Sequence, residues 1–427
     1  MRVLVTGAHG FLGTHLVQAL HGVGHDVLCC GRNAEALRKK FPSCSILSAD
    51  FSSATPYDWD AALRGVSVVI NAVGIIQESG SQTFEAVHHR APTALFQAAE
   101  RVGVRRIIHI SALGADADAV TPYHRTKQAG DDALRALKLD WVILQPSLVY
   151  GAGGRSHTFF SALAALPVLV VPGRGDQPIQ PVHVEDLTAG IVRLVDLQAP
   201  SRMTIPVVGP EPVTYRHFLA GIRAWLGLRP STTLSMPMVC MRVVSRVGDV
   251  CKSPFVNSGT LSMLCRGNVA DPSAFSTATG IRPRTLAEGL PPHGADYGTF
   301  AAACLYFLLP ALRGSLVAVW IGSGLVSLFA FPIETSEGWL RQVGIPEALT
   351  RPTLVVASAL DITLGLALGV RWRVGLVLAV QFALTLGFTV VLTLSMPEWW
   401  AHPFGPLLKN LPLLAATWLL WALERRT

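Results

Sequence analysis

The sequence contains few charged residues. Asp, Glu, Lys and Arg make up 15% of its 427 residues, and hydrophobic residues make up 50%, whereas an average soluble protein has about 25% charged residues. This shortage of charge excludes an intrinsically disordered chain and argues against a purely soluble enzyme. The length indicates two or three domains.

Metal-binding and redox cysteine spacings are also missing. The seven cysteines include the adjacent Cys29 and Cys30, and none of them forms a Cys-x-x-Cys pair. We interpret them as reduced thiols in the cytosol and predict no metal site. The first residues contain no basic segment followed by an apolar core. No secretory signal peptide is therefore predicted.

No strongly basic region is present either. The net charge is +7, and neither the part before Gly298 nor the part after it carries a large positive excess. This distribution excludes a nucleic-acid partner. A phosphate-bearing ligand or an anionic membrane surface explains the excess better.

The first 290 residues or so alternate short apolar runs with helix-like segments. The runs that have the length and composition of buried strands are residues 3–6, 26–30, 45–49, 66–71, 106–111 and 141–144. Such alternation predicts βαβ units, and hence a doubly wound α/β domain of Rossmann type with a parallel sheet. The alternation weakens after Pro146. We therefore expect the domain to span residues 1–292, with a smaller substrate lobe mainly at 151–292.

The last third of the chain contains long apolar stretches. Residues 314–333 and 374–397 carry no charge, residues 352–370 carry only Asp361, and residues 399–423 carry only Lys409. Each stretch is long enough to cross a hydrocarbon core of about 30 Å. The sequence thus predicts a bundle of four transmembrane helices within residues 299–427. The segment 300–309 is too short to span and is either an interfacial helix or an extension of the first span.

Arginines flank these stretches on one predicted side. Arg313 precedes the first span, Arg371 and Arg373 lie between the second and third, and Arg425 and Arg426 follow the fourth. By the positive-inside rule, the amino-terminal domain and both termini are expected in the cytoplasm. The predicted location is the inner (cytoplasmic) membrane.

The two charged residues within the spans call for partners. Counted along ideal helices, Asp361 and Lys409 lie at similar depths. We hypothesise that they pair inside the bundle. The alternative is that Lys409 extends to the outer interface while Asp361 is protonated.

A glycine-rich loop follows the first predicted strand. Residues 7–13 read Gly-Ala-His-Gly-Phe-Leu-Gly and open an amphipathic helix. Glycines at such a turn let the backbone approach a pyrophosphate, whose charge is met by the helix start. Arg32 stands at the end of the second strand, where NAD-binding proteins carry an acid. Arg32 favours NADP(H), while NAD(H) stays possible, and Asp50 after the third strand is expected to face the adenine or to cap the next turn.

A candidate catalytic group lies after the fifth predicted strand. Tyr123 and Lys127 are four residues apart near a helix start, so they share one face. A phenol with a pKa near 10 becomes a useful acid or base when a neighbouring cation stabilises its phenolate. Ser111, at the strand end, is placed to hydrogen-bond a substrate carbonyl or hydroxyl.

Six motifs in residues 1–292 carry a family resemblance. They are Thr-Gly-Ala-His-Gly-Phe-Leu-Gly at 6–13, Asn-Ala-Val-Gly-Ile at 71–75, Ile-Ser-Ala-Leu-Gly-Ala at 110–115, Tyr-x-x-x-Lys at 123–127, Pro-Ser-Leu-Val-Tyr-Gly at 146–151 and Pro-Val-His-Val-Glu-Asp at 181–186. With them the chain resembles an atypical, extended short-chain dehydrogenase/reductase. Its branch includes the NADPH-binding accessory subunit of respiratory complex I.

The resemblance implies roles for these residues. Tyr123 would be the acid/base, Lys127 would bind the nicotinamide ribose and lower the Tyr123 pKa, and Ser111 would orient the substrate. The residues then expected around the cofactor are Thr6, Gly7, Gly10, Phe11, Leu12, Gly13, Arg32, Asp50, Asn71, Ala72, Val73, Gly74, Lys127, Pro146 and Ser147. Residues 299–427, with His-Pro-Phe-Gly-Pro at 402–406, resemble the DoxX-like membrane domain.

These features lead to one expected function and two alternatives. We expect a membrane-anchored, NADP(H)-dependent oxidoreductase acting on a lipophilic carbonyl, alcohol or quinone-like substrate. One alternative is a non-catalytic NADPH-binding subunit or assembly factor of a membrane redox complex. The other is a nucleotide-sugar epimerase or dehydratase. The sequence does not specify an oligomeric state.

Overall fold

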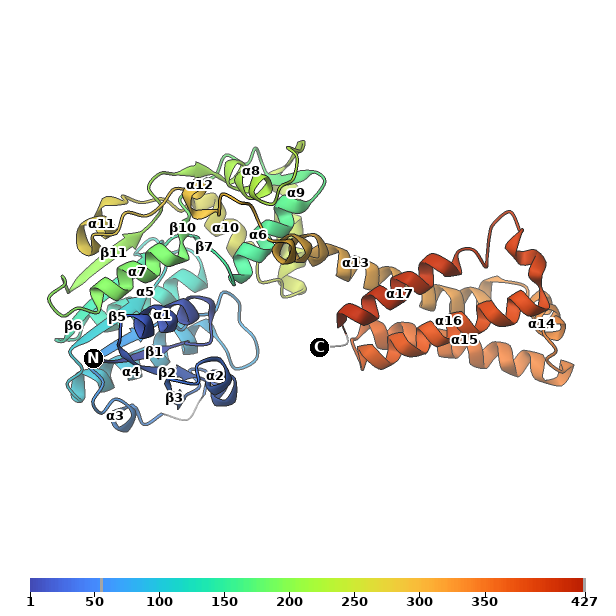
Figure 1. Ribbon diagram of the computed structural model, residues 1–427, viewed down its shortest axis with the longest axis horizontal. Helices are drawn as coiled ribbons and strands as arrows, with labels where there is room; N and C mark the ends of the chain where they lie inside the picture. The colour runs from blue at the N-terminus through green and yellow to red at the C-terminus, as the bar shows by residue number, and fades with distance from the viewer. Residues whose placement is uncertain (54–56, 425–427) are drawn as a thin grey trace. The chain divides into compact units, whose positions relative to one another are not determined.

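The structure is a computed structural model that describes residues 1–53 and 57–424. It divides into two compact units, Met1–Ala303 and Cys304–Thr427, whose common border lies within one long helix. Figure 1 labels elements of both units. Arg425 and Arg426, which entered the orientation argument, lie outside the described residues.

The first unit is built on a seven-stranded parallel sheet, which confirms the predicted Rossmann-like fold. The strand order is β11-β6-β5-β4-β1-β2-β3. The strands are β1 (Arg2–Thr6), β2 (Asp26–Gly31), β3 (Ser45–Ser48), β4 (Val68–Asn71), β5 (Arg106–Ile110), β6 (Asp140–Pro146) and β11 (Met203–Val207). The order reverses between β1 and β4, and in open α/β sheets ligands bind at such a switch point.

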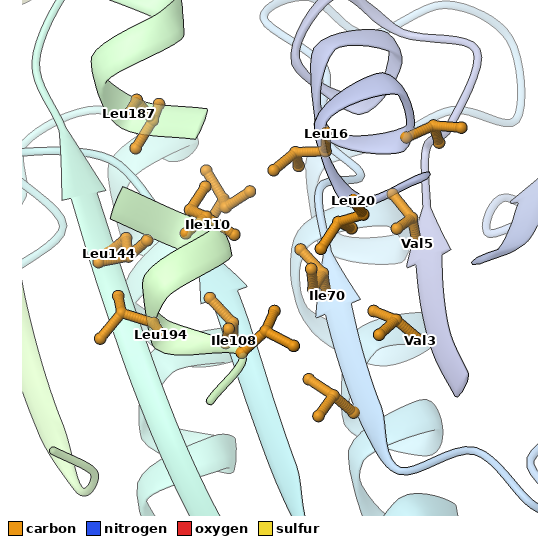
Figure 2. Packing of buried hydrophobic residues seen from close by; sticks show 14 of the residues in the cluster. Val3, Val5, Leu16, Leu20, Ile70, Ile108, Ile110, Leu144, Leu187 and Leu194 are labelled. Atoms are coloured by element: carbon orange, nitrogen blue, oxygen red, sulfur yellow. The ribbon is translucent and has the colours of Figure 1, made fainter. Parts of the chain in front are cut away.

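Helices cover both faces of this sheet. They are α1 (Phe11–Gly22), α2 (Ala34–Lys40), α3 (Trp59–Ala62), η1 (Glu85–Arg90), α4 (Ala91–Arg101), α5 (Pro122–Arg135) and α7 (Val184–Leu194). On one face, Leu16 and Leu20 of α1 and Leu187 of α7 pack with Val3 and Val5 of β1 in one buried cluster (Figure 2).

The opposite face buries the alternate strand residues. Leu4 of β1 packs with Leu95 and Phe96 of α4 and with Leu134 of α5. Because successive strand residues point to opposite faces, one apolar run serves both layers. Each fully buried side chain of this size contributes about 1.5–3 kcal/mol, which fixes the strand ends where the glycine loop begins.

The seventh strand, β11, was missed by the sequence analysis. It pairs in parallel with β6 at the edge of the sheet and contains Pro206. A proline cannot donate to a strand ladder and is confined to sheet edges. The sequence analysis assigned residues 203–207 to the smaller lobe and not to the sheet.

The remainder of the first unit forms a smaller lobe of short elements. Its helices are α6 (Arg155–Ala165), α8 (Tyr215–Trp225), α9 (Met238–Val250), α10 (Ser258–Arg266), α11 (Ser273–Thr279) and α12 (Leu286–Gly289). Two-stranded pairs join β7 (Val149–Tyr150) to β10 (Val182–His183), β8 (Leu169–Pro172) to β13 (Thr233–Met236) and β9 (Pro178–Ile179) to β12 (Val213–Thr214).

The second unit is helical. Its elements are α13 (Tyr297–Leu325), η2 (Val326–Ala330), α14 (Ile333–Gln342), α15 (Glu347–Gly369), α16 (Val374–Ser395), η3 (Pro397–Trp400) and α17 (Asn410–Glu424). Within the described residues, three helices are long and apolar enough to cross a membrane: Tyr297–Ala330, Glu347–Gly369 and Val374–Ser395. The segment 300–309 lies inside α13 and therefore extends the first span.

Up to Glu424, the last residue described, a fourth helix of full spanning length is not found. The described part of α17 has 15 residues and measures about 22 Å, less than the hydrocarbon thickness of about 30 Å. Pro403, Pro406 and the positive φ of Gly405 delay the helix until Asn410. The stretch 399–423 was thus counted as helix although its first part is a loop.

The hypothesised pair of Asp361 and Lys409 was also wrong. Lys409 lies in the turn before α17, so its depth does not follow from a helical rise. None of the ion pairs among residues 1–53 and 57–424 joins it to Asp361. Instead, Arg313 of α13 forms an ion pair with Glu424 of α17.

Candidate functional site

The loop between β1 and α1 needs glycine at two positions. Gly7 has φ +67°, and a Cβ on it would lie 2.9 Å from the carbonyl oxygen of Ala72. A Cβ on Gly13 would lie 2.1 Å from the carbonyl oxygen of Gly7. Gly10 is the N-cap of α1, which starts at Phe11 and continues through Leu12. The loop therefore brings a side-chain-free backbone to a helix start, which suits an anionic phosphate group.

The ends of β1 and β4 lie side by side beneath this loop. Thr6 Oγ1 donates a 2.7 Å hydrogen bond to Asn71 Oδ1, and both side chains are buried. Ala72 and Val73 then pass beside Gly7. The structure thus brings the predicted residues at 6–13 and 71–73 together at the switch point of the sheet.

Arg32 and Asp50 lie at the ends of the neighbouring strands β2 and β3. Asp50 Oδ1 accepts hydrogen bonds from the Ser52 backbone N–H at 2.8 Å and from Ser52 Oγ at 2.7 Å, so it caps the turn as one alternative expected. Partial burial opposes ionisation, but these bonds and the charge of Arg32 lower the Asp50 pKa. Arg32 itself is exposed at the sheet edge.

Ser111 and Lys127 both contact the carboxyl end of β5. Lys127 Nζ donates a 2.9 Å hydrogen bond to the carbonyl oxygen of Ile110. Ser111 Oγ donates a 2.8 Å hydrogen bond to Asp131 Oδ2. Lys127 also lies beside Gly74, where a Cβ would be 3.2 Å from Nζ. The triad is therefore adjacent to the strand ends that carry the glycine loop.

Tyr123 is one turn before Lys127 on α5, whose N-cap Thr121 accepts a hydrogen bond from the His124 backbone N–H. The phenol ring packs edge-on against His88, with ring centroids 5.2 Å apart, and against Phe84 at 5.9 Å. These rings hold Tyr123 half-buried at the wall of the site.

The pKa values of Tyr123 and Lys127 correct one expectation. Burial, assisted by the negative charge of Asp131, raises the pKa of Tyr123 to about 12. Burial lowers the pKa of Lys127 to about 8, against the opposing effect of Asp131. Lys127 is not among the causes of the Tyr123 shift, and the pKa of Tyr123 moves in the direction opposite to the expected one because burial disfavours the phenolate. At neutral pH the phenol keeps its proton.

Asp131 was missed by the sequence analysis. It is fully buried and accepts hydrogen bonds from Ser111 and from Gln145 Nε2, at 3.2 Å. Its Oδ1 lies 3.4 Å from Nε2 of the buried His109. Burial raises the pKa of Asp131 to about 6 and lowers that of His109 well below its ordinary value. The sequence feature that could have identified Asp131 is its spacing of four residues from Lys127, which places both residues on one face of the helix.

Polar contacts continue from Asp131 across the sheet. The other ring nitrogen of His109, Nδ1, lies 3.0 Å from Asn71 Nδ2, and Asn71 in turn accepts from Thr6. A chain of buried polar groups thus links the candidate catalytic serine to the floor of the glycine loop. The link between Asp131 Oδ1 and His109 Nε2 is a close polar contact that makes no hydrogen bond, so the chain is continuous in space but not fully hydrogen-bonded.

The predicted loop after β6 is partly engaged in internal contacts. Pro146 ends β6, and Ser147 Oγ donates a 2.5 Å hydrogen bond to the carbonyl oxygen of Gln180. The Ser147 hydroxyl is therefore committed to the fold. The backbone is engaged as well, because the Leu113 N–H donates to the carbonyl oxygen of Pro146 and the Ser147 N–H donates to that of Val207. A cofactor contact of Pro146 and Ser147 stays a prediction.

A cavity of about 510 Å³ opens beside Tyr123. Its lining is mixed: it includes the apolar Ile76, Phe84 and Met263 and the charged Asp249 and Lys252 of the smaller lobe. A larger cavity of about 660 Å³ lies near His157 and Arg284 and touches none of Ser111, Tyr123 and Lys127. Of these two cavities, the smaller is the one that Tyr123 lines, and neither is lined by Ser111 or Lys127.

Two parts of the chain match known protein families. Residues 7–158 match the NAD(P)H-binding family, and residues 317–418 match the DoxX-like family. The chain joins an NAD(P)H-binding domain to a DoxX-like domain. The nicotinamide cofactor class predicted from the glycine loop is thereby confirmed.

Curated relatives match mainly this NAD(P)H-binding domain. The ceramide reductase of Caulobacter vibrioides is 28% identical over 53% of this chain and 71% of its own length. NADH dehydrogenase [ubiquinone] 1 alpha subcomplex subunit 9 of Mus musculus is 28% identical over 62% of this chain and 71% of its own length. A photosystem II assembly factor of Synechocystis sp. is 28% identical over 49% of this chain and 63% of its own.

Solved structures share the fold of the same domain. A UDP-glucuronic acid 4-epimerase from Bacillus cereus with UDP-glucuronic acid and NAD superposes with a TM-score of 0.54 at 20% identity, over 72% of this chain and 100% of that chain. MoeE5 with UDP-glucose and NAD gives a TM-score of 0.53 at 22% identity, over the same shares. At this identity the likeness concerns the fold alone.

Proposed function

We propose that this protein is a membrane-anchored, NADP(H)-dependent oxidoreductase of the short-chain dehydrogenase/reductase type, with functional domains at residues 1–292 and 299–427. Its substrate is a lipophilic carbonyl or alcohol, or a quinone-like compound. The observation that carries the proposal is Tyr123 at the wall of a cavity, with Lys127 one turn further along α5 and hydrogen-bonded to the carbonyl oxygen of Ile110, directly before Ser111.

The residues present fit a dinucleotide. A Cβ at Gly7 or Gly13 would collide with the backbone of Ala72 or of Gly7, so glycine at both positions keeps the loop packed closely at the start of α1, where a pyrophosphate would bind. Gly74 and Lys127, which lie beside each other after β4 and on α5, would then hold the nicotinamide end. When bound, the cofactor supplies or accepts the hydride.

NADP(H) is favoured over NAD(H) by the charge at the end of β2. The exposed guanidinium of Arg32 suits bidentate contact with a 2′-phosphate. It lies close enough to Asp50 to lower the pKa of that carboxyl. The Arg32 side chain is thus the feature that selects the phosphorylated nucleotide.

Tyr123 acts as the proton donor when a carbonyl is reduced. Its pKa of about 12 keeps the phenol protonated at pH 7, and an alkoxide forming in the cavity is basic enough to take that proton. Lys127, with a pKa of about 8, is mostly cationic at pH 7 and stabilises the negative charge left on the phenol. Asp131 accepts a hydrogen bond from Ser111 and so holds that hydroxyl in place after the end of β5.

Two observations favour a lipophilic substrate. Ile76, Phe84 and Met263 contribute apolar side chains to the mixed lining of the cavity beside Tyr123. The chain also carries helices able to cross a membrane. The name of one relative, ceramide reductase, agrees with a lipid carbonyl.

A second candidate function is a non-catalytic NADPH-binding subunit or assembly factor of a membrane redox complex. The relatives named as a subunit of NADH dehydrogenase and as a photosystem II assembly factor favour it. That function needs Arg32 and the glycine loop but not Tyr123. Nucleotide-sugar epimerisation is a third candidate, which shares the Tyr123 and Lys127 pair.

We place the NAD(P)H-binding domain in the cytoplasm, on the inner membrane. Arg313, Arg371 and Arg373 support this orientation by the positive-inside rule. The short helix α17 packs on α16 within the bundle.

Turnover by a Tyr123→Phe variant separates the candidates. The full chain in nanodiscs is assayed for NADPH oxidation with long-chain ketones and with quinones. We expect Tyr123→Phe to lower kcat by about 10²–10⁴-fold without changing the Kd for NADPH. Tyr297→Phe, at an exposed tyrosine, is the matched control. If Tyr123→Phe leaves a measurable wild-type turnover unchanged, the proposed chemistry is wrong; if it leaves cellular function unchanged, the subunit is favoured.

A further inference from the structure

Helix α9 of the smaller lobe exposes an apolar face. Val239, Val243, Val247 and Val250 are spaced by four, four and three residues, so they share one side of the helix. Their exposed fractions are 69%, 56%, 57% and 83%. Val244, at 41%, widens the same stripe. An exposed patch of this kind on a folded domain marks an interaction surface.

The opposite side of α9 is fixed to the domain by small residues. Ser245 and Gly248 are its buried residues. A Cβ on Gly248 would lie 1.7 Å from the carbonyl oxygen of Val256, so the helix rests directly on the backbone that leads into α10. Since this contact leaves no room for a side chain, the valines stay on the outside.

The charges beside the stripe are positive. Arg242 and Arg246 are exposed one position before Val243 and Val247, at the margin of the apolar face, and Lys252 follows the helix. The acidic residue of α9, Asp249, instead accepts hydrogen bonds from the backbone N–H and Oγ of Ser258. An apolar stripe bordered by cations complements a lipid surface that contains anionic headgroups.

We infer that the valine face of α9 lies in the interface of a bilayer that contains anionic lipids. The chain itself carries helices able to cross a membrane, which keeps this domain close to a lipid surface. The carboxyl end of α9 also reaches the substrate cavity, since Asp249, Lys252 and Ser253 line the same 510 Å³ space as Tyr123. This last step rests on the proposed function: a lipid substrate enters the cavity along α9 without crossing water.

Site-directed labelling of the full chain tests the inference. Val243→Cys is labelled with the environment-sensitive fluorophore NBD in nanodiscs that contain lipids with a doxyl quencher on the acyl chain. The matched control is Val23→Cys, at a valine that is 60% exposed in the turn after α1. The accessible native cysteines are first replaced by serine: Cys44, Cys240, Cys251, Cys265 and Cys304. NADPH binding by each labelled protein verifies that the domain is folded.

We expect at least threefold stronger quenching at position 243 than at position 23. Quenching at 243 should fall when phosphatidylglycerol is replaced by phosphatidylcholine or when salt is raised, because the arginine contribution is screened. Equal weak quenching at both positions overturns the inference. A blue-shifted emission at 243 without lipid quenching also overturns it, since protein, such as a second copy of the chain, then covers the face.

The readout does not depend on turnover, so a failed reductase assay leaves it intact. A second variant tests the link to the substrate. Val247→Asp should raise KM severalfold for a long-chain ketone and leave KM unchanged for a short, water-soluble one. Equal KM values for wild type and variant with the long-chain substrate would refute the proposed entry of substrate along α9. The labelling experiment would still test the membrane contact of α9 independently.

Discussion

Replacing Gly13 by alanine tests the phosphate loop directly. The new Cβ would lie 2.1 Å from the Gly7 carbonyl oxygen and 2.8 Å from the Ala8 Cα. Both neighbours are backbone atoms, so either the loop or the start of α1 must move by an ångström or more. Such overpacking costs about 1–3 kcal/mol. Because the moved groups are those that would face the pyrophosphate, we expect the Kd for NADPH to rise at least tenfold, or about 1.4 kcal/mol.

Gly22 at the other end of the same helix provides the control. A Cβ there meets nothing within 4 Å, and alanine is favoured over glycine in a helix by about 0.5–1 kcal/mol. Gly22→Ala should therefore bind NADPH as the wild type does and unfold at an equal or higher temperature. The assay is NADPH fluorescence on the full chain in detergent. A Gly13→Ala protein that binds within twofold of wild type would refute the reasoning, as would an equal loss in Gly22→Ala.

Three further predictions concern charge. Arg32→Ala should weaken NADPH binding by about 10–100-fold, the loss of a charged hydrogen bond, and leave NADH binding unchanged; equal losses for both nucleotides would contradict it. Turnover should fall as the pH rises through about 8, where Lys127 loses its proton, and a rate that is flat to pH 10 would count against this role. Burial raises the pKa of Asp131 from its ordinary value of 3.8 to about 6 in the folded state, so the native state binds a proton more tightly than the unfolded state. The free energy of unfolding should therefore fall by on the order of 2–3 kcal/mol as the pH rises from about 4 to 6. Asp131→Asn should remove this pH dependence in thermal melts.

The site was predictable where the signal is local in the chain. The glycines at 7, 10 and 13 directly follow an apolar strand, and Tyr123 and Lys127 are one turn apart on one helix. Local geometry fixes both groups, so a single segment suffices to place them. The other six strands of the seven-stranded sheet were found for the same reason.

The features that were missed depend on distant segments or on where a helix begins. Asp131 matters because it contacts His109 on β5 and Ser111 directly after that strand, and both are buried. β11 contains a proline and belongs to the sheet only through its partner β6. The start of α17 follows from the loop that contains Pro403, Gly405 and Pro406 and not from hydrophobicity.

The central claim is that the loop after β1 and the end of β4 hold a nicotinamide dinucleotide. Hydrogen–deuterium exchange of the full chain in nanodiscs, with and without saturating NADPH, tests it most directly. The account predicts slower exchange on NADPH binding in peptides that cover residues 6–13 and 71–74, and no change in peptides from α15 and α16. Exchange that is unaltered in both loop peptides at saturating NADPH would contradict it.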